Sequence, residues 1–125
     1  MNPADLKYSK EHEWARVDGN TVTIGITQFA AEQLGDVVYV DLPDAGSELE
    51  QFSKFGEIES VKTVSDLFSP VGGKIVEVND EVKDSPEKVN EDTYGDGWLL
   101  KIEISDTSQL DSLMDSSSYE SLIAE

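Results

Sequence analysis

The stretch from residue 56 to residue 66 constrains the fold of this chain more than any other segment. Side chains from Ile58 to Val64 alternate with polar neighbours, and β-branched residues are concentrated at the centre, as they are in strands. A reversal at residues 61–63 joins two short strands in a hairpin and directs Lys62 into solvent. Acidic residues surround this lysine, and no other basic residue lies within the interval 55–73. We therefore predict a β-hairpin that displays a single amine at its tip.

Short alternating segments also occupy much of the remaining chain, and turn-forming residues separate them. Residues 18–20 and 43–46 have the composition of turns. The clearest alternation of apolar and polar side chains is at residues 98–104. Besides the hairpin, we expect strands at residues 8–17, 21–24, 36–42, 74–78 and 98–104. The predicted fold class is therefore mainly β.

Helical signals are confined to short segments between and after these strands. Residues 25–35 predict a helix, in which Thr27 caps the start and Gly35 suits the exit. The other expected elements are a one-turn helix near 85–87, a polar connection at 47–55, and helices at 108–114 and 118–124, the last with the capping-box spacing of Ser117 and Glu120.

The length and composition indicate one domain of ordinary size. With 125 residues, of which 38% are hydrophobic, the chain can bury a modest core, and we expect a single domain over residues 1–125. The absence of cysteine excludes disulfides, thiolate metal sites and a cysteine nucleophile. No apolar run has membrane-spanning length, and residues 1–6 lack the basic start and apolar stretch of a signal peptide. We expect a cytoplasmic protein with no membrane partner.

The charge balance excludes one class of partner. The chain has 27 Asp and Glu residues against nine Lys and Arg residues, which gives a net charge of −18. This argues against nucleic-acid binding, because neutralising phosphates needs a basic face. The acidity itself has two interpretations that the sequence leaves open. It serves solubility or adaptation to high salt, or it steers the protein towards partners with basic docking surfaces.

Few residues are candidates for catalysis. His12 is the only histidine, and it has no metal-ligand companion at helical or zinc-finger spacing. An enzyme that uses paired carboxylates is an alternative hypothesis, but such pairs are inevitable among 27 acidic residues and therefore uninformative. The chain has no Gly-rich phosphate loop and no nucleophile elbow. We expect no catalytic residue and no metal site, and we expect Trp14 to belong to the core.

Several motifs resemble the glycine cleavage system H protein family. The segment Glu59-Ser60-Val61-Lys62-Thr63-Val64-Ser65-Asp66, followed by residues 69–75, is similar to the lipoylation segment of that family. Thr63 departs from the family pattern, which more often has alanine there. The resemblance extends to residues 8–14, to a Gly-Ile-Thr…Leu-Gly-Asp pattern at 25–36, and to residues 90–99. It covers about residues 8 to 104, and the carboxy-terminal helices match less specifically.

This resemblance implies a fold and a set of site residues. The fold is a barrel-sandwich hybrid, as in lipoyl and biotinyl carriers, with a core at about 8–104, short flanking helices and a helical C-terminal extension at about 108–124. Lys62 would carry lipoate in amide linkage. In the family, the glutamate before the tryptophan holds the lipoyl-lysine arm when that arm carries its cargo. Glu13 is therefore the candidate for docking the arm. The neighbours of the lysine would either guide the modifying enzyme or keep the hairpin soluble and shaped: Glu59, Ser60, Val61, Thr63 and Asp66.

The resemblance also implies a carrier rather than an enzyme. Such a carrier shuttles an aminomethyl group from glycine decarboxylase (P protein) to the tetrahydrofolate-dependent aminomethyltransferase (T protein). Dihydrolipoamide dehydrogenase (L protein) then reoxidises it, and lipoate-attaching enzymes are further partners. A monomer is expected. An H-like interaction module, or a lipoyl donor without a role in glycine cleavage, is the alternative, because the same lysine and hairpin would serve it.

Two other carrier classes fit the turn less well. Biotinyl carriers usually flank their lysine with methionines, whereas Val61 and Thr63 stand there in this chain. Lipoyl domains of 2-oxoacid dehydrogenases usually have Asp-Lys-Ala at the turn and belong to longer chains with linkers.

Overall fold

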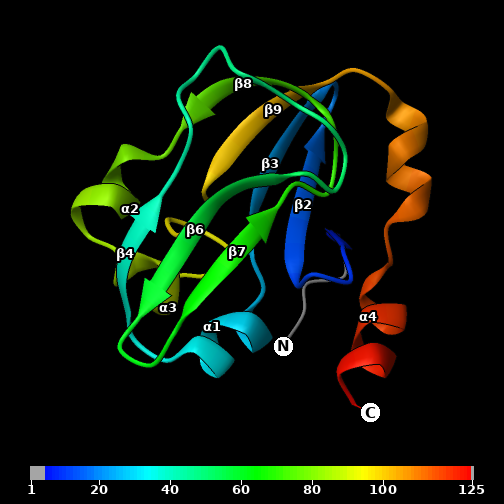
Figure 1. Ribbon diagram of the computed structural model, residues 1–125. Coiled ribbons are helices and arrows are strands. Elements are labelled where there is room, and N and C mark those ends of the chain that lie inside the picture. The colour runs from blue at the N-terminus through cyan, green and yellow to red at the C-terminus, as the bar shows by residue number, and fades with distance from the viewer. Residues whose placement is uncertain (1–4, 125) are drawn as a thin grey trace.

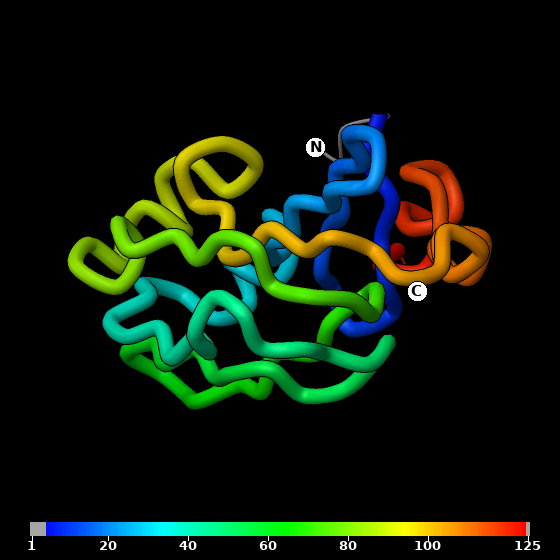
Figure 2. The backbone as a smooth tube through the Cα atoms, turned by 90° about the horizontal axis from the view of Figure 1, so that it is seen from above, coloured from blue at the N-terminus to red at the C-terminus, as the bar shows by residue number. Residues whose placement is uncertain are grey.

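The protein, described for residues 5–124 by a computed structural model, consists mainly of two antiparallel sheets packed face to face (Figures 1 and 2). The larger sheet has the strand order β1-β2-β3-β9-β8-β5. Its strands are β1 (Lys7–Tyr8), β2 (Glu13–Asp18), β3 (Thr21–Ile26), β9 (Leu100–Ile104), β8 (Gly73–Val78) and β5 (Glu48–Leu49). The smaller sheet has the order β4-β6-β7 and is built from β4 (Val37–Asp41), β6 (Lys54–Ser60) and β7 (Val64–Phe68).

The mainly β fold class is confirmed, and the sheets form a sandwich without closing into a barrel. Within the described residues, no strand of one sheet is paired with a strand of the other. The hairpin β6–β7 lies in the smaller sheet, and its turn lies at one end of the molecule (Figure 1). The first four residues and Glu125, which belong to the single domain expected over 1–125, lie outside the described part, and so does most of the segment 1–6.

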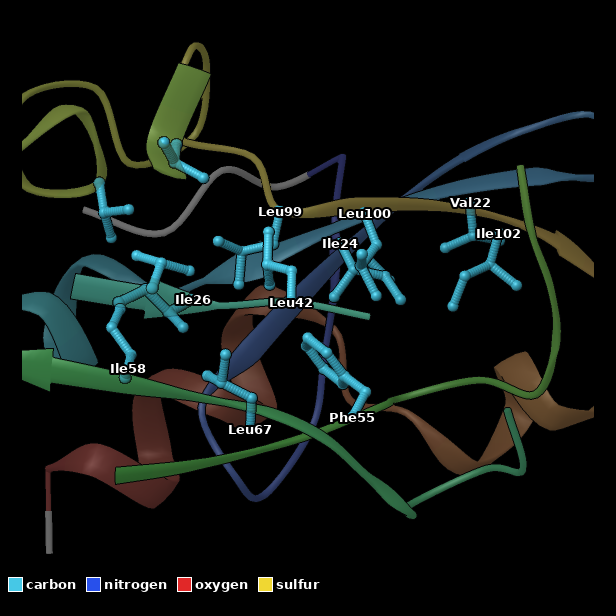
Figure 3. Close-up of a cluster of buried hydrophobic side chains, with 14 of the residues drawn as sticks. Val22, Ile24, Ile26, Leu42, Phe55, Ile58, Leu67, Leu99, Leu100 and Ile102 are labelled. Atoms are coloured by element: carbon cyan, nitrogen blue, oxygen red, sulfur yellow. The ribbon is translucent and has the colours of Figure 1, made fainter. Parts of the chain in front are cut away.

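The principal core lies between the two sheets, because one face of each sheet is lined with aliphatic side chains. Ile24 and Ile102 of the larger sheet face the smaller sheet, which contributes Phe55, Ile58 and Leu67 (Figure 3). Burial of such a side chain stabilises the fold by roughly 1.5–3 kcal/mol. The alternation that predicted the strands is thus the alternation between this core and solvent.

Five short helices flank the sheets within the described residues: α1 (Gln28–Leu34), α2 (Asp80–Asp84), α3 (Lys88–Glu91), the 3₁₀ helix η1 (Thr107–Ser112) and α4 (Ser116–Ile123). The predicted caps of α1 are confirmed. The side chain of Thr27 accepts a hydrogen bond of 3.2 Å from the backbone N–H of Ala30, and Gly35 follows the last turn with φ 81°.

Two predictions for the helices are wrong. The one-turn helix expected near 85–87 does not form: these residues connect α2, whose start the side chain of Asn79 caps, to α3. The capping box predicted for Ser117 and Glu120 does not form. Instead the side chain of Asp115 accepts a hydrogen bond of 2.8 Å from the backbone N–H of Ser118, so α4 begins at Ser116, two residues before the expected start.

Two further segments differ from the expectation. The polar connection at 47–55 contains β5 and the first residues of β6, because a two-residue strand is too short to show a period. The helix expected at 108–114 is η1 and has 3₁₀ geometry. No helix within residues 5–124 is long and apolar enough to cross a membrane.

Candidate functional site

The predicted hairpin around Lys62 is confirmed, and its turn is tight. Glu59 pairs with Val64, and the backbone N–H of Ser60 donates a hydrogen bond of 2.8 Å to the carbonyl oxygen of Thr63. This leaves only two residues in the reversal, Val61 and Lys62. The hydrogen bond between Ser60 and Thr63 closes this reversal and restricts the backbone at the tip.

The side chain of Ser60 lies inside this turn rather than on its surface. It is 6% exposed, and its hydroxyl oxygen accepts hydrogen bonds from the backbone N–H groups of Lys62 (3.1 Å) and Thr63 (3.2 Å). The hydroxyl also lies 3.3 Å from the carbonyl oxygen of Thr63, to which it donates. Ser60 therefore holds the shape of the turn, and little of it is available to a docking protein.

A second set of contacts ties the turn to the loop between α1 and β4. The backbone N–H of Val61 donates a hydrogen bond of 3.0 Å to the carbonyl oxygen of Asp36. The aliphatic part of Lys62 lies over Gly35, where an added Cβ would be 3.1 Å from Cε of the lysine. The turn lies beside the C-terminal end of α1 (Figure 1). The amine is thus displayed from a turn that is held on two sides.

The Lys62 side chain is exposed. Within residues 5–124, the salt bridges use the ammonium groups of Lys54, Lys83, Lys88 and Lys101, and none uses that of Lys62. A protein that reacts with this amine consequently has no ion pair to break first.

The other residues of the predicted lipoylation segment have different environments. Val61 is 67% exposed at the tip, and Thr63 and Glu59 are exposed beside it. Asp66 lies farther down β7 and forms a salt bridge of 3.2 Å with Lys54. The structure thus brings Glu59, Val61 and Thr63 to the surface near Lys62, whereas Asp66 is engaged by another lysine.

A cleft of about 340 Å³ opens between α1 and β7. Leu34, the last residue of α1, contributes to its wall and is adjacent to Gly35, on which Lys62 lies. Asp66 lines the cleft from β7, and Glu13 lines it from the larger sheet. The structure therefore places Glu13, the predicted arm-docking residue, in the wall of a cleft that reaches Leu34, the neighbour of the glycine under Lys62.

Glu13 is almost completely buried, with 1% of its surface exposed. One carboxyl oxygen accepts a hydrogen bond of 2.8 Å from the hydroxyl of Ser9, and the other accepts one of 3.3 Å from the backbone N–H of Phe68. Burial raises the pKa of this carboxyl to about 8, and the hydrogen bonds from Ser9 and Phe68 oppose the rise. At neutral pH the wall of the cleft therefore holds a carboxyl group that is mostly neutral.

His12, for which the sequence indicates no catalytic or metal-binding role, lies in the wall of the same cleft. Its Nδ1 lies 2.7 Å from the hydroxyl of Tyr119, and that hydroxyl lies 2.7 Å from the hydroxyl of Thr27. Burial lowers the pKa of the His12 imidazole, and the nearby charge of Glu11 opposes this. The pairing with Tyr119 could not be found from the sequence, because 107 positions separate the two residues.

No group of three or more His, Cys, Asp or Glu side chains that could hold a metal ion is found within residues 5–124. Trp14 is fully buried, as predicted, and its indole N–H donates a hydrogen bond of 3.1 Å to the carbonyl oxygen of Thr93.

Comparison with known proteins identifies relatives over nearly the whole chain. The profile of the family described as glycine cleavage H-protein matches residues 6–125. The glycine cleavage system H protein of Symbiobacterium thermophilum is 58% identical over 123 residues, which are 98% of this chain and 96% of the relative. That of Staphylococcus haemolyticus is 55% identical over 123 residues, which are 98% of each chain.

A solved structure is also similar throughout. The crystal structure of a glycine cleavage system H protein from Mycobacterium marinum matches with a TM-score of 0.91 and 38% sequence identity. The match covers 98% of this chain and 99% of that one.

Proposed function

We propose, from the premise that this chain belongs to the glycine cleavage H-protein family, that it is a lipoyl carrier in glycine cleavage with the lipoyl group on Lys62. The observation that carries this proposal is the exposed side chain of Lys62 on a two-residue turn that Ser60 and Asp36 hold in place. An attaching enzyme can reach such an amine while the sandwich stays folded.

The surroundings of Lys62 fit an amide-linked arm. Forming the amide removes the positive charge of the lysine, and no salt bridge within residues 5–124 depends on that charge. The arm would start over Gly35, next to the cleft of about 340 Å³. The lipoyl group, when attached, supplies the dithiolane that takes up and hands on the aminomethyl group. The protein supplies attachment, orientation and shelter, so catalysis belongs to the partner enzymes.

Glu13 is the residue that we propose for docking the loaded arm in this cleft. Its raised pKa keeps a proton on the carboxyl at neutral pH, so the group can donate a hydrogen bond as well as accept one. Its contacts with Ser9 and Phe68 fix its orientation. An arm held there is removed from bulk water, which protects a labile cargo between two enzymes.

The remaining residues of the segment divide into two proposed roles. Glu59, Val61 and Thr63 are exposed near the amine, and we assign to them the contacts with lipoate-attaching enzymes. Ser60 stabilises the turn through its hydrogen bonds. Asp66 forms a salt bridge with Lys54 and lines the cleft. In the carrier cycle the successive partners are the P, T and L proteins.

Intact-mass and peptide-mass analysis after incubation with lipoate, ATP and a lipoate–protein ligase tests the proposal. We expect one lipoyl adduct on Lys62 in the wild type and none in K62R, which keeps the charge but not the nucleophile. K54R is the matched control, because Lys54 lies in the same hairpin and is also exposed. An adduct that persists in K62R, or none on folded wild-type protein, overturns the assignment.

A lipoyl donor without a role in glycine cleavage would pass the same test. Glycine–bicarbonate exchange with glycine decarboxylase separates the two hypotheses, since only the glycine-cleavage carrier supports it. Lipoylated protein that does not stimulate the exchange would favour the donor.

A further inference from the structure

Two of the sequence motifs that are distant from the lipoylation segment in the sequence meet next to the Lys62 turn. One is the Leu-Gly-Asp pattern that contains Gly35 and Asp36, and the other is the segment 90–99, which begins with Asn90. The side-chain amide of Asn90 donates a hydrogen bond of 2.9 Å to the carbonyl oxygen of Gly35. Its carbonyl oxygen accepts one of 2.8 Å from the backbone N–H of Val37. One side chain thus closes both ends of the loop 35–37.

The loop that Asn90 holds is the loop on which the turn rests. The carbonyl oxygen of Asp36, the middle residue, accepts a hydrogen bond of 3.0 Å from the backbone N–H of Val61. Gly35, the first residue, provides the surface under the aliphatic part of Lys62. These two contacts of the turn therefore end on a loop that Asn90 bridges, next to the pairing of β4 with β6.

We infer that Asn90 is a positioning residue for Lys62: its carboxamide, by bridging Gly35 and Val37, fixes the direction in which the amine is presented to a modifying enzyme. The inference rests on the proposed function, because it takes Lys62 as the modified residue. The bridge needs one donor and one acceptor on a short planar group, which only Asn provides at this length. Asp supplies the acceptor but places an oxygen against the carbonyl of Gly35.

Loss of the Asn90 bridge affects the kinetics of modification through the fraction of molecules whose turn presents Lys62 correctly. When the turn samples several orientations, only a fraction of the molecules presents the amine productively, and the apparent dissociation constant rises by the inverse of that fraction. Once the enzyme is saturated, the bound turn is the same as in the wild type. Loss of Asn90 therefore acts on KM for the protein substrate and leaves kcat nearly unchanged.

Asn79 offers a matched control. It is 5% exposed, and its amide donates to the carbonyl oxygens of Asp96 (2.9 Å) and Trp98 (2.6 Å). Its side chain also caps α2, and none of these contacts reaches the hairpin. N79A therefore removes an inward-facing asparagine with a similar number of hydrogen bonds but leaves the turn alone.

The experiment measures lipoylation of the full chain by a lipoate–protein ligase with lipoate and ATP, together with hydrogen exchange of the Val61 amide. We expect N90A and N90D to raise KM for the carrier about three- to tenfold with kcat within about twofold of the wild type. The Val61 amide should exchange faster in both. N79A should leave KM and Val61 exchange as in the wild type, even where it lowers the melting temperature more.

Wild-type KM and Val61 protection in N90A would overturn the inference and leave Asn90 with a general structural role. Should N90A fail to fold, N90D carries the test, because it keeps the shape and the acceptor for Val37. Failure of the proposed function looks different, since Lys62 would then not be acylated in the wild type at all.

Discussion

The backbone N–H of Phe68 donates a hydrogen bond of 3.3 Å to the carboxyl group of Glu13, which joins the strand returning from Lys62 to the larger sheet. Glu13 belongs to β2 and Phe68 to β7, so the bond crosses the sandwich. The carboxyl that supports the cleft also helps to hold the two sheets together. Its protonation is therefore coupled to the stability of the fold.

E13Q should change the pH dependence of stability. The carboxyl has an ordinary pKa of 4.5, and burial raises it to about 8, so the folded protein binds more protons than the unfolded chain between these values. The free energy of unfolding of the wild type therefore falls as pH rises through this window, by up to about 1.4 kcal/mol per pH unit. Glutamine does not titrate, and E13Q should lack this fall.

Urea denaturation at pH 5 to 8 measures the free energy of unfolding of both proteins. Parallel profiles for E13Q and the wild type would contradict the buried-carboxyl interpretation, and E59Q, on the surface, is the control.

S60A should loosen the turn. The substitution removes the acceptor for the backbone N–H groups of Lys62 and Thr63, and water can replace it only in part because Ser60 is buried. We expect a loss of about 1–2 kcal/mol in the free energy of unfolding, with slower lipoylation of Lys62. S53A removes an exposed serine hydroxyl that donates to the carbonyl of Glu50, and it serves as the control. Equal effects of the two variants on lipoylation would argue against a role for Ser60 in the turn.

G25A should destabilise the fold strongly. Gly25 pairs with Trp14 across β2 and β3, and an added Cβ would lie 2.6 Å from atoms of the indole ring. Because Trp14 is fully buried and bonded to Thr93, the ring cannot move aside easily. We expect a loss of about 2–3 kcal/mol from overpacking, measured by chemical denaturation. At Gly19 a Cβ would meet nothing within 4 Å, so G19A tests backbone strain alone. A smaller loss in G25A than in G19A would contradict the clash.

Y119F should weaken the attachment of α4. The Tyr119 hydroxyl lies between His12 and Thr27, and its removal leaves the buried Thr27 hydroxyl and the His12 ring without this partner. We expect a loss of about 1–3 kcal/mol and faster amide exchange in α4. Y39F is the matched control, because Tyr39 is 54% exposed on the smaller sheet. Unchanged exchange in α4 would show that the ring stacking of Tyr119 on Tyr8 is sufficient.

Local pattern predicted the elements whose contacts are close in sequence. The hairpin at Lys62 and the caps of α1 depend on residues within a few positions of each other, and both are confirmed. The cap of α2 at Asn79 was not predicted, because an asparagine after a strand suits a turn as well as a helix cap. The pairing of Glu59 with Val64 places Val64 on the outer face, where it is 54% exposed.

The sequence by itself determined the longer strands and that Lys62 stands at a tight reversal, because alternation and turn chemistry are properties of adjacent residues. The tertiary structure decided what surrounds that lysine. Asn90 reaches Gly35 and Glu13 reaches Phe68 across 55 positions each, and His12 meets Tyr119 across 107. Such contacts depend on how the sheets and helices pack, and no local pattern encodes them.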